Sequence, residues 1–375
     1  MRIAIISDLH LGYGRFYEES FTQAQSAFLK AIENRAELVI IPGDIFDTRI
    51  PKPEVFSRAF SLFKMLKNKN IPVIAIHGNH ERRSIREQVN PVQLLESAEF
   101  VKFLHASGEV FEADGEKVFV FGLGAVPEDL AMQAIIQTKP KPQDVFSIFV
   151  FHQTLQEFAP LDKCLSIDEL PEGFDLYVNG HLHKKRIEEC AGKKLLISGS
   201  TVLTQLRKEE TEDKGIFLIE TDGKEFKAEF LPIETMPFIF KELVFKKASL
   251  FQIEERIKEE MEKINEEKQR KSIVKFMLRG TLAEGLKASD ISLPSFENHI
   301  VEFGLEFDED EELKKKIESL RKLREERISA KEKGLSVLGE ILKGKIENCD
   351  EYFNLLEDSA EALYSRIMGE IENEK

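Results

Sequence analysis

The chain has 375 residues, and at roughly 150 residues per domain this length suggests two or three domains. With 42% hydrophobic and 32% charged residues, the composition is typical of a soluble globular protein, and no apolar run approaches the ~20 residues that cross a bilayer. The start, MRIAIISDLH, lacks the pattern of a signal peptide. The 3 cysteines are far apart, in neither disulfide nor zinc spacing, so we expect a reducing, cytoplasmic setting.

The net charge of −15 comes from 53 basic and 68 acidic side chains. Proteins that coat nucleic acid with their whole surface are usually basic, because they neutralise phosphates. A chain of this charge that handles DNA or RNA must do so through local basic patches, bound metal or a partner. The charge therefore argues against a simple nucleic-acid coat protein, but not against an enzyme that acts on nucleic acid.

Short β-branched runs alternate with turns and helical patterns through the first ~200 residues, which predicts an α/β domain. The runs are apolar without alternation, as in strands buried on both faces of a sheet that helices cover. We expect strands at Arg2–Ser7, Leu38–Pro42, Val73–Ile76, Ser147–Phe151, Leu176–Val178 and Lys194–Ser198. We expect helices at Glu19–Asn34, Glu54–Lys67 and Pro91–Ser97.

The pattern changes near residue 234, where a small second α/β domain is predicted. Its expected elements are strands at Phe240–Phe245, Ser272–Leu278 and His299–Phe307, with a charged helix at Leu250–Glu267. From residue 308 onward the chain is almost all helix-forming residues, and apolar residues near its end recur at helical spacing. The predicted domains are therefore 1–233, 234–307 and a helical tail at 308–375.

Chemically active side chains follow the predicted strands, at the point where each strand ends. Ligands of open α/β sheets bind beyond the carboxyl ends of the strands. Scattered core histidines would not gather there. The residues in question are Asp8, His10, Asp44, His77, Asn79, His80, His152, His181 and His183.

The residue types and spacings favour a metal site. Asp8 and His10 are two residues apart, so an extended chain directs both to one side, and the same holds for His181 and His183. Carboxylate, amide-oxygen and imidazole ligands together suit Mn²⁺, Fe²⁺ or Zn²⁺ better than Ca²⁺. One carboxylate can bridge two ions roughly 3.5–4 Å apart, the arrangement used in phosphoester hydrolysis.

Each motif taken alone has an ordinary structural explanation. Asp-x-His is usual at a strand end, Gly-Asn forms common turns, and Gly-His-x-His occurs in surface turns. Together, in this order and each after a strand, they predict a dinuclear metal centre. His105 and His299 lie outside the pattern and are interpreted as structural residues.

These motifs resemble those of the calcineurin-like metallophosphoesterases. The similarity is carried by Asp8-x-His10, Gly43-Asp44, Gly78-Asn79-His80-Glu81, His152 and Gly180-His181-x-His183. Within that superfamily, His10-Leu11-Gly12-Tyr13 and Gly43-Asp44-Ile45-Phe46 resemble the Mre-eleven/SbcD double-strand-break repair nucleases. The resemblance implies an α/β class, four-layered metallophosphoesterase sandwich over 1–233, a small DNA-contacting capping domain and a helical tail.

The resemblance also implies two Mn²⁺ ions and a role for each matching residue. One ion would be held by Asp8, His10, Asp44 and His183, and the other by Asp44, Asn79, His152 and His181, so that Asp44 bridges. His80 would stabilise the transition state or protonate the leaving 3′ oxygen. Asp47 stands where the repair nucleases often have a histidine; it would either orient a ligand from outside the metal shell or cap the following segment.

Basic residues follow two of the motifs: Arg82 and Arg83 come after His80, and Lys184, Lys185 and Arg186 come after His183. One interpretation is that they hold flanking phosphates of a DNA strand. The alternative is ordinary solvated loop charge.

The resemblance implies partners as well. The helical tail would bind the coiled-coil base of an ABC-type ATPase of the Rad-fifty/SbcC kind, unless it packs as a subdomain of its own. A homodimer is also implied. The apolar helix around Phe56, Ala59, Phe60, Phe63 and Leu66 is either a dimer face or core.

We therefore interpret the sequence as a manganese-dependent DNA nuclease, exonuclease and endonuclease, that acts in double-strand-break repair with an ATPase partner. A small-molecule phosphodiesterase or phosphatase is the first alternative, and the ~140 residues beyond the core weigh against it. A catalytically silent scaffold is the second. The complete ligand set weighs against that, because unpaired polar clusters are costly to keep.

Overall fold

The computed structural model of the chain describes residues 1–83, 89–138, 145–158, 164–223, 225–267, 271–296, 298–307 and 364–366. Its contacts divide the chain into two compact units. The first comprises Met1–Val244, Phe251–Leu278 and Ser292–Leu305, and the second comprises Phe245–Leu250, Arg279–Ile291 and Glu306–Lys375. All candidate metal ligands lie in the first unit.

One sheet of the first unit is six-stranded, in the order β12-β11-β1-β2-β3-β4. Its strands are β1 (Arg2–Ile5), β2 (Leu38–Ile41), β3 (Val73–Ala75), β4 (Lys102–Phe103), β11 (Gly215–Thr221) and β12 (Phe226–Pro232). Strands β1 to β4 run parallel to one another, whereas β11 is antiparallel to both β1 and β12.

A second six-stranded sheet has the order β5-β6-β7-β8-β10-β9. Its strands are β5 (Ser107–Ala113), β6 (Glu116–Leu123), β7 (Phe146–Phe151), β8 (Leu176–Asn179), β9 (Arg186–Cys190) and β10 (Lys193–Ile197). The four central strands run parallel, and the edge strands β5 and β9 are antiparallel to their neighbours.

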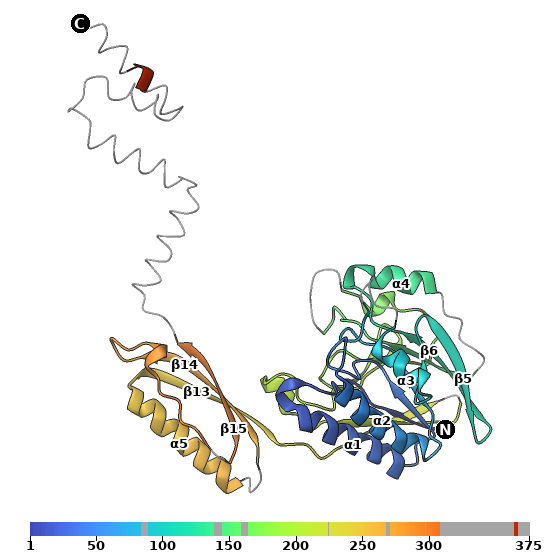
Figure 1. Cartoon of the computed structure of the whole chain (residues 1–375), viewed down its shortest axis with the longest axis horizontal. Helices are drawn as coiled ribbons and strands as arrows, with labels where there is room; N and C mark the ends of the chain where they lie inside the picture. The colour runs from blue at the N-terminus through green and yellow to red at the C-terminus, as the bar shows by residue number, and fades with distance from the viewer. Residues whose placement is uncertain are drawn as a thin grey trace. The chain divides into compact units, whose positions relative to one another are not determined.

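Helices cover the outer faces of both sheets (Figure 1). They are α1 (Tyr17–Glu33), α2 (Pro53–Lys67), α3 (Pro91–Ser97) and α4 (Ala131–Thr138). Residues of α1, α2 and α3 form one core with the outer face of the first sheet, and residues of α4 form another with the second sheet. A third core lies between the two sheets. The four-layered α/β fold is therefore confirmed.

The strand residues explain why the sequence shows unbroken apolar runs. In β1, Ile3 and Ile5 point into the core between the sheets, whereas Ala4 packs with the helices, as does Ile6 just beyond the strand. Alternate side chains of a strand point to opposite faces, so a strand buried on both faces must be apolar throughout. The predicted strands and helices of this domain are all present, with ends that differ by one or two residues.

Several strands were not predicted, and the edge strands show why. In β5, β9 and β12, charged residues alternate with apolar ones, and much of each strand is exposed. Such strands lack the apolar run that marks the buried ones. Arg186 is the first residue of β9 and therefore lies at the start of an edge strand.

The carboxyl ends of the central strands are aligned by their register. In the first sheet, Ile41 of β2 is paired with Ala75 of β3, and in the second, Phe151 of β7 is paired with Asn179 of β8. The loops after these strands therefore leave each sheet at a common edge, which is where parallel sheets carry their sites.

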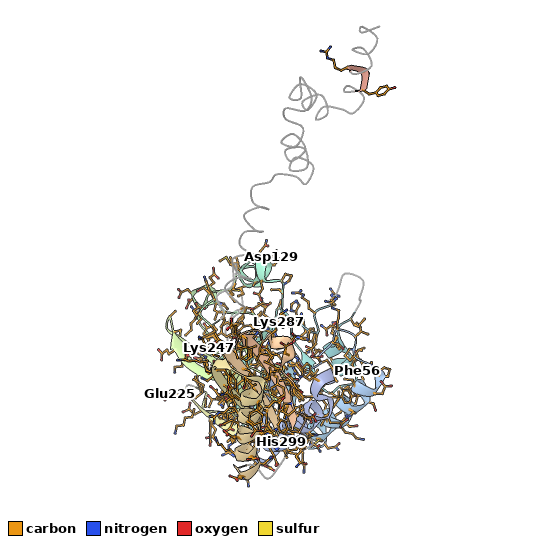
Figure 2. All side chains as sticks on the ribbon, turned by 90° about the vertical axis from the view of Figure 1, so that its left-hand side faces the viewer. Phe56, Asp129, Glu225, Lys247, Lys287 and His299 are labelled. Carbon is orange, nitrogen blue, oxygen red and sulfur yellow. The ribbon has the colours of Figure 1, made fainter. Side chains whose placement is uncertain are left out.

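Beyond residue 234, a three-stranded sheet has the order β13-β14-β15. Its elements are β13 (Phe238–Ala248), α5 (Leu250–Glu267), β14 (Ile273–Leu282) and β15 (Ile300–Phe307). The charged helix α5 buries a stripe at Ile253, Ile257, Met261 and Ile264, at the spacing of one helical face. His299, labelled in Figure 2, is buried and lies 2.7 Å from Asn265 through its Nε2 atom, as a structural residue would.

The predicted helical tail, 308–375, lies outside the described residues except for 364–366, which are helical. On α2, Ala59, Phe63 and Leu66 are buried in the core of this chain, while Phe56 (labelled in Figure 2) and Phe60 are partly buried. None of the helices in the described ranges is both long and apolar enough to cross a bilayer.

Candidate metal centre

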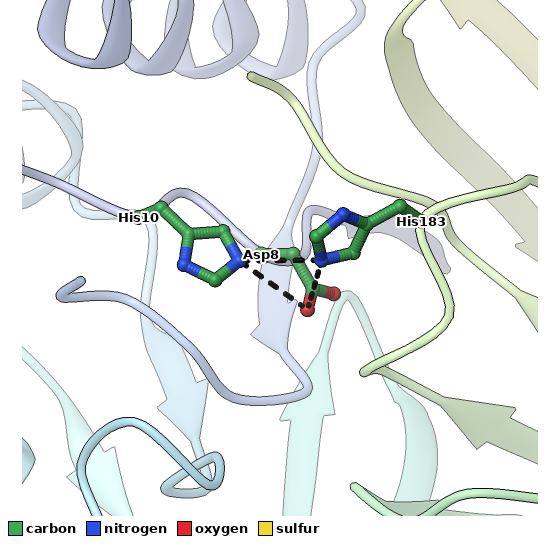
Figure 3. A group of neighbouring side chains, drawn as sticks. All are labelled: Asp8, His10 and His183. Carbon is green, nitrogen blue, oxygen red and sulfur yellow. Dashed lines mark hydrogen bonds and ion pairs between the residues drawn. The ribbon is translucent and has the colours of Figure 1, made fainter. Parts of the chain in front are cut away.

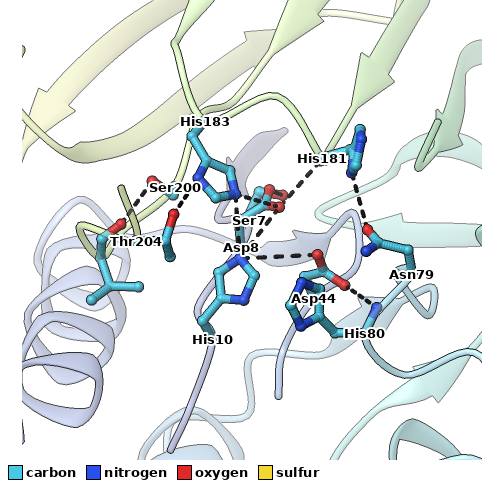
Figure 4. Close-up of polar contacts among 12 residues, drawn as sticks. Ser7, Asp8, His10, Asp44, Asn79, His80, His181, His183, Ser200 and Thr204 are labelled. Carbon is cyan, nitrogen blue, oxygen red and sulfur yellow. Dashed lines mark hydrogen bonds and ion pairs between the residues drawn. The ribbon is translucent and has the colours of Figure 1, made fainter. Parts of the chain in front are cut away.

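The candidate ligands are carried by loops that follow strands of both sheets, and they meet in one place (Figure 4). Asp8 and His10 follow β1, Asp44 follows β2, and Asn79 and His80 follow β3. His152 follows β7 directly, and His181 and His183 follow β8. The two sheets thus contribute to one cluster from their aligned strand ends.

One group consists of Asp8, His10 and His183 (Figure 3). Nε2 of His183 lies 3.7 Å from Oδ1 of Asp8, and Nε2 of His10 lies 4.0 Å from the same oxygen. The two imidazole nitrogens are 3.3 Å apart. The three ligand atoms therefore surround a single point, as around one cation.

The second group consists of Asp44, His152 and His181, with Asn79 beside them. Oδ1 of Asn79 lies 3.1 Å from Nε2 of His152 and 3.0 Å from Nδ1 of His181. Oδ2 of Asp44 lies 3.3 Å from Nε2 of His152 and 3.9 Å from Nε2 of His10. The same Asp44 oxygen thus faces both groups, which is the position of a bridging ligand.

The hydrogen bonds on the far side of each imidazole test whether this donor set fits a cation. Nδ1 of His152 donates to the carbonyl oxygen of Pro42 at 2.7 Å, so in the neutral ring Nε2 is an acceptor. That acceptor faces the oxygens of Asp44 and Asn79, which are acceptors too. Once the Nε2 proton of His152 is lost, these acceptors converge with no hydrogen between them, which fits a metal ion.

His181 has the same arrangement. Its Nε2 lies 3.0 Å from Oγ1 of Thr154, and that hydroxyl donates to Oε1 of Glu128 at 2.7 Å. Thr154 therefore accepts from His181, which leaves Nδ1 of His181 as an acceptor facing Asn79. The donor set of both groups fits cations, and together with the fold it implies a dinuclear metal centre.

Burial and charge shift the pKa values of these groups strongly. Burial disfavours the charged form of His152, but the Asp44 carboxylate outweighs it and raises the pKa of His152 to about 9. Burial and the nearby charge of His152 lower the pKa of His181 to about 4. Burial would raise the pKa of Asp44, but His152 and His10 outweigh it and lower that pKa.

The backbone is strained at several of the ligands. Asp8, His10, Asp44 and His181 have φ values of +50°, +43°, +50° and +72°, in the left-handed region that non-glycine residues seldom adopt. Such residues cluster at functional sites, where the surrounding fold must stabilise them. Gly78 is required for another reason, because a Cβ there would come within 2.0 Å of Oδ1 of Asp44.

Glu81, the last residue of the Gly-Asn-His-Glu motif, connects two of the ligand loops. It is fully buried, and its carboxyl oxygens accept from the backbone N–H of Phe46 at 2.8 Å and of Gly78 at 3.0 Å. Burial, with the nearby Asp44 carboxylate, raises its pKa to about 8. The motif carries the family resemblance, but the sequence predicts no role for this residue. It holds the loop after β2 against the loop after β3.

His80 lies at the edge of the cluster and is partly exposed. Its backbone N–H donates to Oδ1 of Asp44 at 3.0 Å, and its Nδ1 donates to the carbonyl oxygen of Asp47 at 2.7 Å. The carboxylate of Asp47 lies 3.5 Å from Nδ1 of His10 and 3.8 Å from Nδ1 of His80. Asp47 therefore contacts both a candidate ligand and the candidate catalytic histidine.

The basic residues after His183 are already paired with acceptors. Nζ of Lys184 lies 3.1 Å from Glu212, and Nζ of Lys185 donates to the carbonyl oxygen of Asp213 at 2.8 Å. Arg186 lies 3.0 Å from Glu188. Arg82 and Arg83 follow the motif of His80 and are half-buried and exposed respectively.

His77 and His105 form a separate contact outside both ligand groups. Their rings are 4.7 Å apart, Nε2 of His77 donates to the carbonyl oxygen of Ala125 at 3.1 Å, and Nδ1 of His105 accepts from the N–H of Gly124. The interpretation of His105 as structural agrees with these bonds. Residues that sequence analysis missed are Thr154, Thr204 and Glu128, which belong to no recognisable motif.

Residues 1–185 match the family model described as calcineurin-like phosphoesterase, the superfamily that the motifs of this chain resemble. The chain is also similar to proteins described as DNA double-strand break repair protein Mre11, which confirms the resemblance predicted from the motifs. The Sulfolobus acidocaldarius protein is 33% identical over 243 residues, covering 60% of this chain and 61% of that protein.

Two further relatives carry the same description. The Archaeoglobus fulgidus protein is 29% identical over 271 residues, covering 63% of this chain and 60% of its own. The Sulfurisphaera tokodaii protein is 31% identical over 237 residues, covering 59% and 60%. This chain thus spans about 60% of the length of these relatives.

Proposed function

We propose that this chain is a metal-dependent nuclease that hydrolyses phosphodiester bonds of DNA in double-strand-break repair. The observation that carries the proposal is the pair of ligand groups joined by Asp44, with His80 at their edge. The description of the similar proteins as double-strand break repair proteins supports the choice of DNA as substrate.

In this proposal one ion is held by Asp8, His10, Asp44 and His183, and the other by Asp44, Asn79, His152 and His181. We propose Mn²⁺ because both groups mix carboxylate with imidazole donors and the second adds the amide oxygen of Asn79, a set that suits Mn²⁺ better than Ca²⁺. When bound, two such ions polarise the phosphate and lower the pKa of a bound water toward neutrality.

The remaining chemistry falls to this chain's own residues. Nδ1 of His80 is committed to the carbonyl oxygen of Asp47, so its Nε2 is the atom available to a substrate. We propose that Nε2 carries a proton to the leaving 3′ oxygen.

Partners and domain roles are further parts of the proposal. Residues 1–233 would form the nuclease domain, 234–307 a DNA-contacting cap, and 308–375 the segment that binds an ABC-type coiled-coil ATPase. Arg82, Arg83, Lys184, Lys185 and Arg186 would hold flanking phosphates. Since Lys184 and Lys185 have protein partners, DNA must replace those contacts. A homodimer would use the partly exposed residues of α2.

The test is Mn²⁺-dependent digestion of end-labelled duplex DNA, run beside hydrolysis of a small aryl phosphodiester. The control is the double variant Asp8→Ala/His80→Ser, which lacks one ligand and the proposed proton donor. Degradation of DNA by the wild type but not by the control is the expected result. Turnover of the aryl ester alone would contradict the proposal and favour a small-molecule phosphodiesterase.

A further inference from the structure

A buried ion pair lies behind His183, outside both ligand groups. Glu210 is in the short 3-10 helix Lys208–Thr211, and Lys214 immediately precedes β11. Oε2 of Glu210 bonds to Nζ of Lys214, which also donates to Oγ of Ser200 at 2.9 Å. Each of the two charged side chains is only 10% exposed.

The other carboxylate oxygen of Glu210 is directed toward the metal cluster. Oε1 lies 3.7 Å from Nδ1 of His183, the ring nitrogen opposite to the one that faces Asp8 and His10. The same Nδ1 lies 2.6 Å from Oγ1 of Thr204. This contact is marked in Figure 4. A carboxylate and a hydroxyl therefore face the outer nitrogen of this imidazole.

The charge state of the pair follows from its surroundings. A buried carboxylate that lost its cation would be strongly destabilised, since burial of an unpaired charge costs far more than burial of a pair. Lys214 thus keeps Glu210 charged where solvent could not.

The other candidate histidine ligands have different outer partners. His152 donates to the carbonyl oxygen of Pro42, and His181 to the hydroxyl of Thr154. His10 lies 3.5 Å from Asp47, whose side chain is 19% exposed. Among the described residues, the outer nitrogen of His183 is the one for which the structure gives a nearby carboxylate bonded to a buried ammonium.

We propose that Glu210 and Lys214 are a positioning pair for His183: they keep its Nδ1 protonated and its Nε2 directed at the ion that Asp8 and His10 share. This inference rests on the proposed two-metal function. Partners on the outer nitrogen of a ligand histidine fix its tautomer and raise its basicity, and their loss typically costs 10- to 100-fold in metal affinity. The pair lies beyond residue 185, where the match to the phosphoesterase family ends.

The test is calorimetric titration of the metal-free full chain with Mn²⁺, for the wild type and for Glu210→Gln and Lys214→Met. Each substitution is expected to weaken one of two binding steps about 10- to 100-fold. That step is identified as the one that Asp8→Ala abolishes. Lys193→Met is the matched control, because Lys193 is also a buried lysine, paired with Glu172 at 2.8 Å. The Mn²⁺ affinities of Lys193→Met at both binding steps should equal those of the wild type.

A spectroscopic readout separates positioning from a purely structural role. In metal-free protein labelled with ¹⁵N-histidine, His183 should be protonated at Nδ1 in the wild type and populate the other tautomer in Glu210→Gln. The double variant Glu210→Gln/Lys214→Met removes both charges, so it should fold even if a single variant does not, and should bind Mn²⁺ as Glu210→Gln does.

Two results would overturn the inference, and they differ from failure of the proposed function. Unchanged Mn²⁺ steps in the folded double variant would show that the pair does not act on His183. An equal loss of Mn²⁺ affinity at both binding steps would indicate a structural role instead. A wild type that binds no pair of Mn²⁺ ions would refute the two-metal function itself, and the inference with it.

Discussion

Oδ2 of Asp44 lies 3.3 Å from Nε2 of His152, while Nδ1 of the same ring donates to the backbone. In the metal-free protein a proton on Nε2 stabilises this contact, which is why the pKa of His152 is raised to about 9. A metal ion competes with that proton for the same atom, so metal binding and protonation of His152 are coupled.

The coupling predicts proton release on Mn²⁺ binding. At pH 7 His152 is protonated in the metal-free chain, and the ion must displace the proton; above pH 9 it is already neutral. Apparent Mn²⁺ affinity should therefore rise with pH and level off near pH 9. Calorimetry at pH 7 in buffers of different ionisation enthalpy checks this. Heats that do not depend on the buffer would contradict it.

The same pKa shift gives a stability prediction for the metal-free chain. Because the pKa of His152 is higher in the folded state than the ~6.5 of the unfolded state, its contribution is fully present below about pH 6.5 and is lost as pH rises toward 9. The free energy of unfolding, measured with urea, should fall less between pH 6.5 and pH 9 for His152→Asn than for the wild type. Equal losses in the two proteins would exclude His152 as the cause.

His80 allows a test of its two possible roles. If its Nε2 protonates the leaving oxygen, His80→Asn should slow DNA hydrolysis by about 10²- to 10⁴-fold. A p-nitrophenyl diester, whose leaving group needs no proton, should be slowed far less. If His80 only stabilises the transition state, both substrates should slow alike. Comparison of kcat for the two substrates distinguishes these outcomes, with Mn²⁺ affinity as the control for an intact site.

Glu81 predicts a stability effect that does not involve metal. In Glu81→Gln the amide NH₂ must face the N–H of Phe46 or of Gly78, so one buried donor loses its acceptor. We expect the free energy of unfolding to fall by about 1–3 kcal/mol. Glu96→Gln is the matched control, because Glu96 accepts from one N–H only, that of Phe103, and the amide oxygen can replace it. Similar denaturation midpoints for both variants would contradict this role.

The backbone strain at His181 can be measured by difference. His181→Gly and His181→Ala both remove the imidazole, but only glycine relieves the φ of +72°. In the metal-free chain the glycine variant should be the more stable by about 1 kcal/mol. At His183, which is absent from the positive-φ residues, the order should reverse. Denaturant unfolding of the four variants shows whether the glycine or the alanine variant is the more stable at each position.

The convergence of the candidate ligands was predictable, because buried parallel strands are visible as apolar runs and their ends must share an edge. Asp8, Asp44 and His152 each follow such a run. Their assignment as ligands stays a prediction, as do the domain boundaries. The strands β5, β9 and β12 were not predictable in this way, since their exposed faces interrupt the apolar pattern.

Partners that come from distant segments could not be predicted either. Asp213 accepts from Lys185 across 28 residues, and Thr204 faces His183 across 21, with no motif to mark either contact. Sequence shows Lys184 and Lys185 as a run of positive charge, whereas the fold pairs both with the carboxylate of Glu212, and Lys185 also donates to the backbone carbonyl of Asp213. Glu212 and Asp213 lie just before β11, and no local sequence pattern shows that this segment lies beside Lys184 and Lys185.

The alignment of strand ends has a consequence during synthesis. His10 and His183 face each other although 173 residues separate them along the chain. A ribosome must therefore complete β8 and the loop after it before the first group of ligands can exist. A nascent chain that has folded only its first strands and helices presents carboxylates and imidazoles that do not yet converge, so the candidate metal centre forms only once both sheets have joined.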